Sequence, residues 1–346
     1  MKIQHQTTKK KIELLLSNEI YFSSETTIPF PFERSTAGPS TYKKTITLQL
    51  NTSTIKLPVS NNPSAQFSLH QENSQYHIMK NNTLFFKNVK PLHVPYHAPN
   101  QAFLNISNQC IHNCGFCALS TCHHRLSPCI TSTNINKIIT KTQANPKIKG
   151  YAFTGGVYPN QKHHIQLISQ FIQQVRKNNP TIAIGVEPTI QSTQEIQTLY
   201  DAGATEIKIN IQTSTPQQFH CLCPGFSYEH IGDMLEHAVD LFGKGKVCSN
   251  IIYGLGETKE ELLSCTTYLS TLGVVPTLRL IRTTALIKKE LEKRLRRQLV
   301  QPSVEYIFDI ACNHKNLLEE NNLTTKSFQT MCHACESCDI VPFKDV

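Results

Sequence analysis

The sequence lacks long apolar runs and is poor in charge. Of its 346 residues, 39% are hydrophobic and 17% are charged. No apolar stretch approaches the roughly 18 residues that a membrane-spanning helix needs, and the composition does not favour bulk disorder. The first residues contain lysines but no apolar core followed by small residues, so they do not resemble a secretory signal. We therefore expect a soluble, cytoplasmic globular protein with no membrane partner.

The sequence also lacks a G-x-G-x-x-G pattern after any expected strand. From about residue 102, buried strands alternate with helix-length segments, which is typical of parallel βα units. Polar or Gly-rich loops follow the strands, so the α/β fold that we expect is an incomplete (β/α)6-type TIM barrel rather than a doubly wound sheet. The six expected strands cover residues 102–107, 151–156, 181–188, 206–213, 246–254 and 275–282.

The pattern divides the chain into three parts. Residues 1–99 hold a short helical pattern, an irregular connection, and five short β-branched or alternating runs that predict a small antiparallel β subdomain. Residues 100–300 form the partial barrel. Residues 301–346 hold a helix and then a cysteine-rich tail.

Thirteen cysteines are too few for a disulfide scaffold, and the number is odd. In a reducing compartment such a count indicates metal ligation or redox chemistry. Two dense triplets support this interpretation. They are Cys110, Cys114 and Cys117, and Cys332, Cys335 and Cys338.

The first triplet, spaced C-x3-C-x2-C, directly follows the first expected barrel strand. Three thiolates on one loop can bind three irons of a [4Fe–4S] cube and leave the fourth iron without a protein ligand. A structural zinc site would need a fourth Cys or His, and we expect His112 to point the wrong way in so tight a loop. The spacing therefore favours an iron–sulfur cluster.

This motif, with the aromatic Phe116 before its third cysteine, resembles the signature of the radical S-adenosylmethionine (SAM) superfamily over roughly residues 100–285. The resemblance implies that SAM chelates the open iron and is cleaved to a 5′-deoxyadenosyl radical, which makes Cys110, Cys114 and Cys117 both metal ligands and catalytic residues. It also implies an external one-electron donor of the flavodoxin or ferredoxin type.

Further motifs resemble the same superfamily. Gly155 and Gly156 are similar to its Gly-Gly-Glu motif, with Val157 in place of the acid. In the fourth strand, Asn210 and Gln212 take the positions that contact the SAM ribose and the substrate in the biotin synthase branch. In this chain, Gln212 replaces the acid that the branch has at that position.

The fifth strand and its turn resemble the biotin synthase branch as well, and Gly254 belongs to the turn. That branch holds a second, [2Fe–2S] cluster with cysteines on three strands, of which only Cys248 is present, so we do not expect biotin synthesis. Glu187, at the end of the third strand, is either a SAM contact or a buried acid paired with a lysine.

The second triplet predicts an auxiliary iron–sulfur cluster or a zinc ion. His333 and Cys312 are candidate fourth ligands for zinc. Two further cysteines, Cys221 and Cys223, either face the substrate or are free thiols, because one intervening residue makes a poor chelate.

Residues 279–299 carry an excess of six positive charges out of the chain's nine. A basic helix can bind nucleic acid, although such runs are more often solvated. Arg279 and Arg282 could bind a carboxylate or form a salt bridge at the barrel rim. We expect a small-molecule substrate. The alternatives are a radical enzyme that modifies tRNA or a peptide, and a non-catalytic iron–sulfur or zinc protein.

Overall fold

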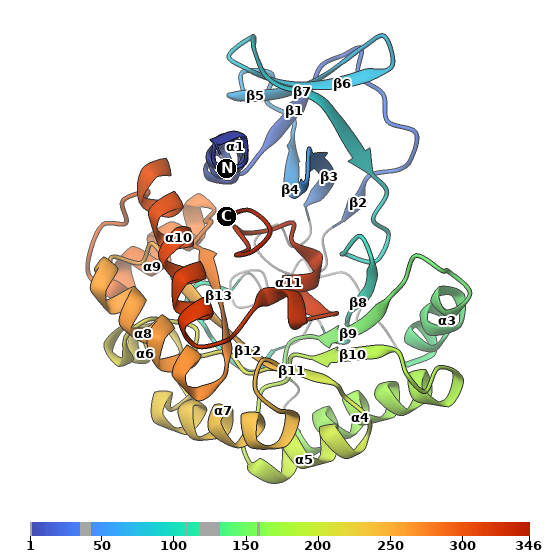
Figure 1. Cartoon of the computed structure of the whole chain (residues 1–346), viewed down its shortest axis with the longest axis vertical. Helices are drawn as coiled ribbons and strands as arrows, with labels where there is room; N and C mark the ends of the chain where they lie inside the picture. Colours follow the sequence, from blue (N-terminus) through green and yellow to red (C-terminus); the bar gives the residue numbers. More distant parts are fainter. Residues whose placement is uncertain (1, 35–42, 108–109, 118–131, 158–159) are drawn as a thin grey trace.

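The computed structural model describes residues 2–34, 43–107, 110–117, 132–157 and 160–346. Figure 1 shows a sheet surrounded by helices, with a separate β-rich layer above it. Among the described residues, no helix is long and apolar enough to cross a membrane.

Six parallel strands form one sheet, as the sequence predicted. Each strand pairs with its neighbours in the sequence, which is the order of a barrel rather than of a doubly wound sheet, where the order reverses. Most of their residues are buried, because one face packs on helices and the other faces the interior. The strands are β8 (Gln101–Asn105), β9 (Gly150–Thr154), β10 (Ala183–Val186), β11 (Glu206–Lys208), β12 (Val247–Tyr253) and β13 (Val275–Leu280).

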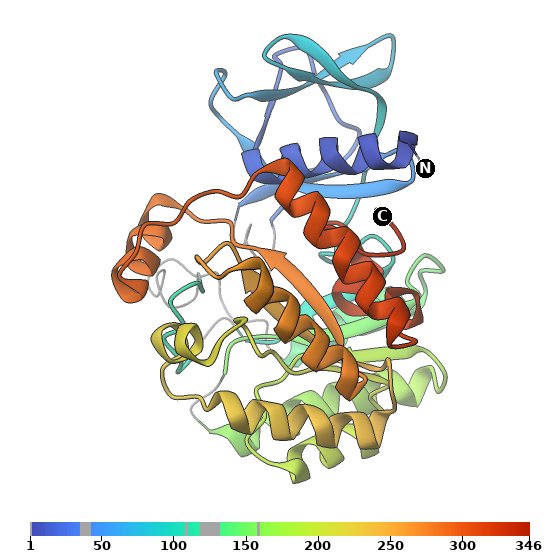
Figure 2. The same cartoon turned by 60° about the vertical axis from the view of Figure 1, so that its left-hand side comes forward.

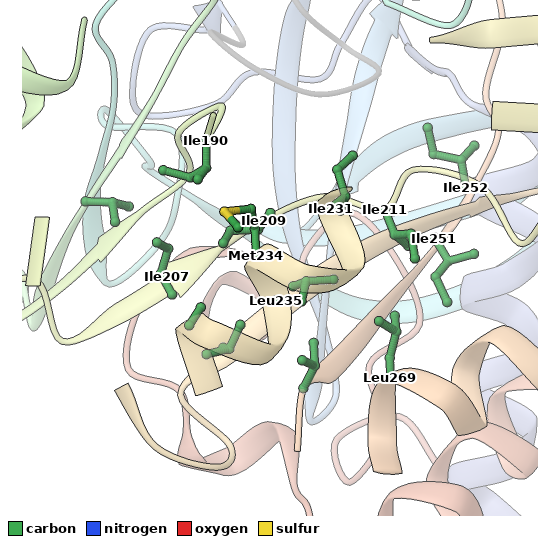
Figure 3. Packing of buried hydrophobic residues seen from close by; sticks show 14 of the residues in the cluster. Ile190, Ile207, Ile209, Ile211, Ile231, Met234, Leu235, Ile251, Ile252 and Leu269 are labelled. Atoms are coloured by element: carbon green, nitrogen blue, oxygen red, sulfur yellow. The ribbon is translucent and has the colours of Figure 1, made fainter. Parts of the chain in front are cut away.

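Helices cover the outer face of this sheet (Figures 1 and 2). Their apolar sides form the largest core of the protein, and Figure 3 shows the part of it between β11, β12 and the helices outside them. A capping box formed by Thr258 and Glu261 begins the last of the helices that alternate with strands. The helices are α3 (Ser132–Gln143), α4 (Gln161–Asn178), α5 (Thr193–Asp201), α6 (Pro216–Leu222), α7 (Tyr228–Phe242) and α8 (Lys259–Leu272).

After β13, the chain continues through α9 (Ala285–Leu295), α10 (Val304–Glu320), the 3-10 turn η1 (Thr325–Ser327) and α11 (Met331–Cys335). The last of these, α11, lies against the inner face of the curved sheet (Figure 1).

Glycine permits this placement of α11. A Cβ atom on Gly185 of β10 would lie 2.1 Å from Thr330 Oγ1. The buried Glu206 carboxylate accepts the backbone N–H of Thr330 at 3.0 Å, and Gln101 exchanges two hydrogen bonds with the Met331 backbone. Residues 331–346, which we call the cysteine-rich segment, are therefore anchored at their start to the inner face of the sheet.

The residues before the barrel build a seven-stranded sheet with a core of its own. All five predicted strands are present, but the expectation of a wholly antiparallel sheet is wrong. A short strand missed in the sequence, β1, runs parallel to β4 and to β5, because three residues are too few to show an alternating pattern. The elements are α1 (Lys2–Ser17), β1 (Ile20–Phe22), β2 (Glu33–Arg34), β3 (Lys44–Leu50), β4 (Ser53–Ser60), β5 (Phe67–Glu72), β6 (Gln75–Lys80) and β7 (Thr83–Leu92).

The N-terminal layer, which consists of α1 and β1 to β7, and the barrel meet on the elements that follow the barrel. Helix α1 packs on α10, and Ile340 of the cysteine-rich segment contacts the cores of both layers. The division of the chain at residues 99 and 300 stays a proposal.

Candidate active site

One cavity of about 360 Å³ opens inside the sheet, between the carboxyl ends of the strands, the loop after β8 and the cysteine-rich segment. Both cysteine triplets line it, although they are far apart in the sequence. Most of the residues predicted to bind SAM line it too. These are Phe116, Gly155, Gly156, Glu187, Asn210 and Gln212.

Gly254 does not line this cavity as described. It lies in the turn after β12 with a φ of +85°, a conformation that favours glycine. The Glu257 carboxylate accepts its N–H at 2.6 Å and the N–H of Leu255 at 2.9 Å. Gly254 therefore shapes the turn at the end of the strand, and its predicted contact with SAM stays a prediction.

The loop of the first triplet is held by its backbone. Ile111 N–H donates to the Val157 carbonyl at 3.0 Å, and Gly115 N–H donates to the Leu222 carbonyl at 2.8 Å. Arg294 of α9 donates to the Asn113 carbonyl at 2.8 Å. These bonds tie the loop to the end of β9, to α6 and to α9. Cys122 and Cys129 lie outside the described residues.

Cys223 is a site residue for which the sequence left two interpretations open. It is buried, lines the cavity and shares a hydrogen bond with Cys114, a bond that lowers the pKa of Cys114 and raises that of Cys223. The neighbouring Cys221 is exposed. No local pattern could have paired Cys223 with Cys114, because the fold brings the end of α6 onto the loop.

The two glycines after β9 pack against the first strand. A Cβ on Gly155 would lie 2.9 Å from the Ser107 nitrogen and 3.1 Å from Asn105 Oδ1. Gly156 N–H donates to the Ser107 carbonyl at 2.8 Å. At Gly155 the absence of a side chain is thus required by close packing beside the cavity.

A buried ion pair occupies the strand ends next to them. Glu187 Oε1 lies 3.1 Å from Lys208 Nζ and accepts a hydrogen bond from Asn210 Nδ2 at 2.8 Å. Burial disfavours the charged carboxylate, but Lys208 and the hydrogen bonds outweigh it and lower the pKa of Glu187. The structure shows the pairing with a lysine that was one of the two interpretations of Glu187, whose side chain is 17% exposed, and the predicted contact with SAM stays a prediction.

Asn210 and Gln212 are held by β12. Asn210 Oδ1 accepts the Asn250 N–H at 3.1 Å, while the backbone of Gln212, with a φ of +67°, bonds Asn250 and Ile252. A non-glycine residue in this region is strained and often marks a functional site. Asn250 Oδ1, buried in the cavity wall, has no hydrogen-bond partner in the described part of the chain.

Two cations face the second triplet. Lys208 Nζ and Arg279 Nη1 donate to Cys332 Sγ at 3.2 Å and 3.1 Å. Arg279 also lies 3.3 Å from Asp339, and Arg282 lies 3.6 Å from the same carboxylate. The two arginines thus make the salt bridge that the sequence offered as one alternative, with a buried acid that sequence reasoning missed.

Of the two candidate fourth ligands for zinc, one lines the cavity and the other does not. His333 lines the cavity, its Nε2 lies 3.0 Å from Thr277 Oγ1, and burial lowers its pKa to about 3, so the ring is neutral. Cys312 lies on α10 and is not among the residues that line the cavity. Within the described ranges, no three Cys, His, Asp or Glu side chains are grouped to hold one metal ion.

The donor set suits iron–sulfur clusters at both triplets. Cysteines of a cube bind separate irons, so they need a shared wall rather than convergence on one point. Each triplet supplies three sulfur atoms to the wall of the cavity, and cations stand beside Cys332. Hydrogen bonds donated to sulfur stabilise anionic cluster ligands.

Comparison with known proteins identifies the central part of the chain. Residues 104–268 match the family model described as Radical SAM superfamily. These residues are a radical SAM domain. The matched range starts in β8 and ends in α8, so it includes the end of β8, the first cysteine loop and the strands β9 to β12.

Two curated relatives match about half of the chain. The chain is 29% identical over 175 residues to biotin synthase 2 of Corynebacterium diphtheriae, covering 49% of this chain and 51% of the relative. It is 24% identical over 172 residues to lipoyl synthase of Koribacter versatilis, covering 46% and 52%. The chain therefore spans about half the length of the curated relatives it matches, and the predicted resemblance is confirmed.

A solved structure shares the fold of this chain. The crystal structure of methylornithine synthase superimposes with a TM-score of 0.53 at 15% identity, over 69% of this chain and 70% of that one. At this identity the likeness shows the barrel-like fold alone.

Proposed function

We propose that this protein is an enzyme that reductively cleaves SAM at a [4Fe–4S] cluster held by Cys110, Cys114 and Cys117. When bound, the cluster supplies one electron that splits SAM into methionine and a 5′-deoxyadenosyl radical, which abstracts a hydrogen atom from the substrate. The observation that carries the proposal is that this triplet, in the part of the chain that matches the radical SAM family, shares a cavity with the strand ends.

The residues of this chain have distinct parts in the proposal. Gly155 and Gly156 would border the methionine end of SAM, as the resemblance implies, and Phe116 would contact SAM beside the first triplet. Asn250 Oδ1, which has no partner among the described residues, is available to accept a hydrogen bond from a ligand. The cysteine-rich segment closes the interior and limits the access of water to a reactive radical.

The second triplet is proposed to hold an auxiliary iron–sulfur cluster in the same cavity. Support comes from the hydrogen bonds that Lys208 and Arg279 donate to Cys332, since donors to sulfur stabilise negatively charged thiolate ligands. An external one-electron donor of the flavodoxin or ferredoxin type is part of the proposal. A zinc ion stays the alternative occupant of the second triplet.

A small molecule is the proposed substrate. The cavity lies inside the curved sheet and is lined by residues of the barrel, the first cysteine loop and the cysteine-rich segment, which favours a substrate small enough to enter it. Arg279 and Arg282, two charges of the basic run, line this cavity, which supports an internal role for part of the run over a surface for nucleic acid.

The test is 5′-deoxyadenosine formation after anaerobic reconstitution with iron and sulfide, with SAM and dithionite. Wild type and Cys221→Ala, whose cysteine is exposed, should both form the product, while Cys114→Ala should form none. Product from Cys114→Ala, or a fully iron-loaded wild type without product, would refute the proposal.

A further inference from the structure

The cysteine-rich segment does not hold its own shape. Its only helix in the described structure is the five-residue α11. Met331, Glu336 and Phe343 have φ values of 58°, 58° and 64°, a region that costs a side-chain-bearing residue about 1–2 kcal/mol. Contacts with other parts of the chain must therefore keep the segment in place.

The strongest of these contacts comes from α1. Lys11 Nζ lies 2.8 Å from Asp345 Oδ2, and both side chains are fully buried. Ser53 Oγ donates to the other carboxylate oxygen at 2.5 Å, and Val341 N–H donates to Oδ2 at 2.8 Å. Asp345 is thus fully paired, which a buried carboxylate requires.

Further contacts reach the stretch between the second and third cysteines of the triplet. Lys11 Nζ also donates to the Glu336 carbonyl at 3.1 Å. Lys56 N–H of β4 donates to the Ser337 carbonyl at 2.7 Å, and Thr54 Oγ1 donates to the Glu336 carbonyl at 3.3 Å. The N-terminal layer therefore grips the backbone beside Cys335.

We propose that the N-terminal layer holds the cysteine-rich segment against the barrel, and that Lys11 and Asp345 are the positioning residues of this clamp. On this account, the layer keeps Cys332, Cys335 and Cys338 in the cavity wall. Removing one partner of a fully buried pair leaves an unpaired charge in the interior, which strongly destabilises the folded arrangement. The intact pair therefore stabilises the position of the cysteine-rich segment.

The experiment measures alkylation of each cysteine by iodoacetamide in the full-length, reduced, metal-free protein, with mass spectrometry as readout. Cys335 is 6% exposed and Cys223, inside the barrel, is 1% exposed. In Lys11→Met, Cys335 should react at least about a hundredfold faster, because the segment opens locally, while Cys223 keeps its rate.

Lys9→Met is the matched control, since Lys9 lies on the same helix but contacts α10, through an exposed ion pair with Glu305 at 3.6 Å and the ring of Phe308. It should leave both rates unchanged. An unchanged rate at Cys335 in Lys11→Met would overturn the proposal, and so would an equal effect of Lys9→Met.

Ser53→Ala is the milder variant, because it keeps the ion pair and removes one hydrogen bond to Asp345. It should raise the alkylation rate of Cys335 alone by about threefold to tenfold. If Lys11→Met unfolds the chain and exposes Cys223 as well, the result for Ser53→Ala decides whether the clamp exists. No change at Cys335 in Ser53→Ala, or equal acceleration at Cys223, would then refute the clamp.

Reconstitution gives a second readout. Lys11→Met should lose about four irons, those of the second triplet, and keep SAM cleavage at the first. The alkylation result needs no metal, so it stands or falls separately from the proposed reaction.

Discussion

The two cysteine regions reach one cavity by different physical means. The loop of residues 110–117 follows β8 directly, and the bonds described for it are mostly backbone hydrogen bonds. The cysteine-rich segment, residues 331–346, comes from the far end of the sequence and is fixed by buried charges and carboxylates. Chain order brings the first region to the end of β8, where mostly backbone hydrogen bonds hold it, whereas buried ion pairs and carboxylates hold the second.

This difference means that the two regions should respond differently to substitution. Buried, paired charges lose several kcal/mol when one partner is removed, while exposed pairs lose little. Four predictions use this contrast, in order of expected effect.

Arg279→Gln should have the largest effect. It removes the cation between Asp339 and Cys332, both of which it contacts inside the cavity. We expect a loss of about 3–5 kcal/mol in the free energy of unfolding, measured by urea denaturation, together with loss of iron at the second triplet alone. A loss of under about 1 kcal/mol would break the contrast.

Gly185→Ala should follow. Its Cβ would lie 2.1 Å from Thr330 Oγ1, so the start of the cysteine-rich segment must shift, which costs about 1–3 kcal/mol. Gly232→Ala in α7 is the control, because its Cβ meets only the hydroxyl of the exposed Tyr268. Equal stability of the two variants in urea would show that the segment does not rest on β10.

Acid should lower the free energy of unfolding through His314, which lies on α10 and lines the cavity. Burial lowers its pKa to about 3 from 6.5. The folded protein keeps the ring neutral while the unfolded chain takes up a proton below pH 6.5, so stability is complete above that pH and falls as pH decreases toward 3. From pH 6.5 to 5, wild type should lose about 1.5 kcal/mol more than His314→Gln. Parallel pH curves of the two proteins would contradict this.

Arg294→Gln should have the smallest effect. Arg294 pairs with Glu290 at 2.7 Å and donates to the loop at Asn113, in partly exposed positions. We expect a loss of at most about 1 kcal/mol in the same denaturation assay. A loss as large as that of Arg279→Gln would remove the distinction between the two regions.

The sequence predicted what local patterns encode. Alternation of apolar runs gave the six barrel strands, and spacing gave both triplets, because three cysteines within one turn or loop leave a short-range signal. The strand β1 escaped prediction because three residues cannot show a period.

The pairings between distant residues could not be predicted. Cys223 against Cys114, Asp339 against Arg279, and Lys11 against Asp345 each join elements that only the fold brings together. Single residues of these types occur throughout any sequence, so these pairings could be identified only from the burial of the side chains and the distances between them. The roles of the site residues as ligands stay predictions.

The central claim is that two triplets with separate duties share one cavity. The most direct test compares two triple variants, one with Cys110, Cys114 and Cys117 changed to Ala and one with Cys332, Cys335 and Cys338 changed to Ala, by iron content and 5′-deoxyadenosine formation. We predict about eight irons in wild type and about four in each variant, with SAM cleavage kept only when the first triplet is intact. Cleavage without the first triplet, or eight irons without the second, would contradict the account.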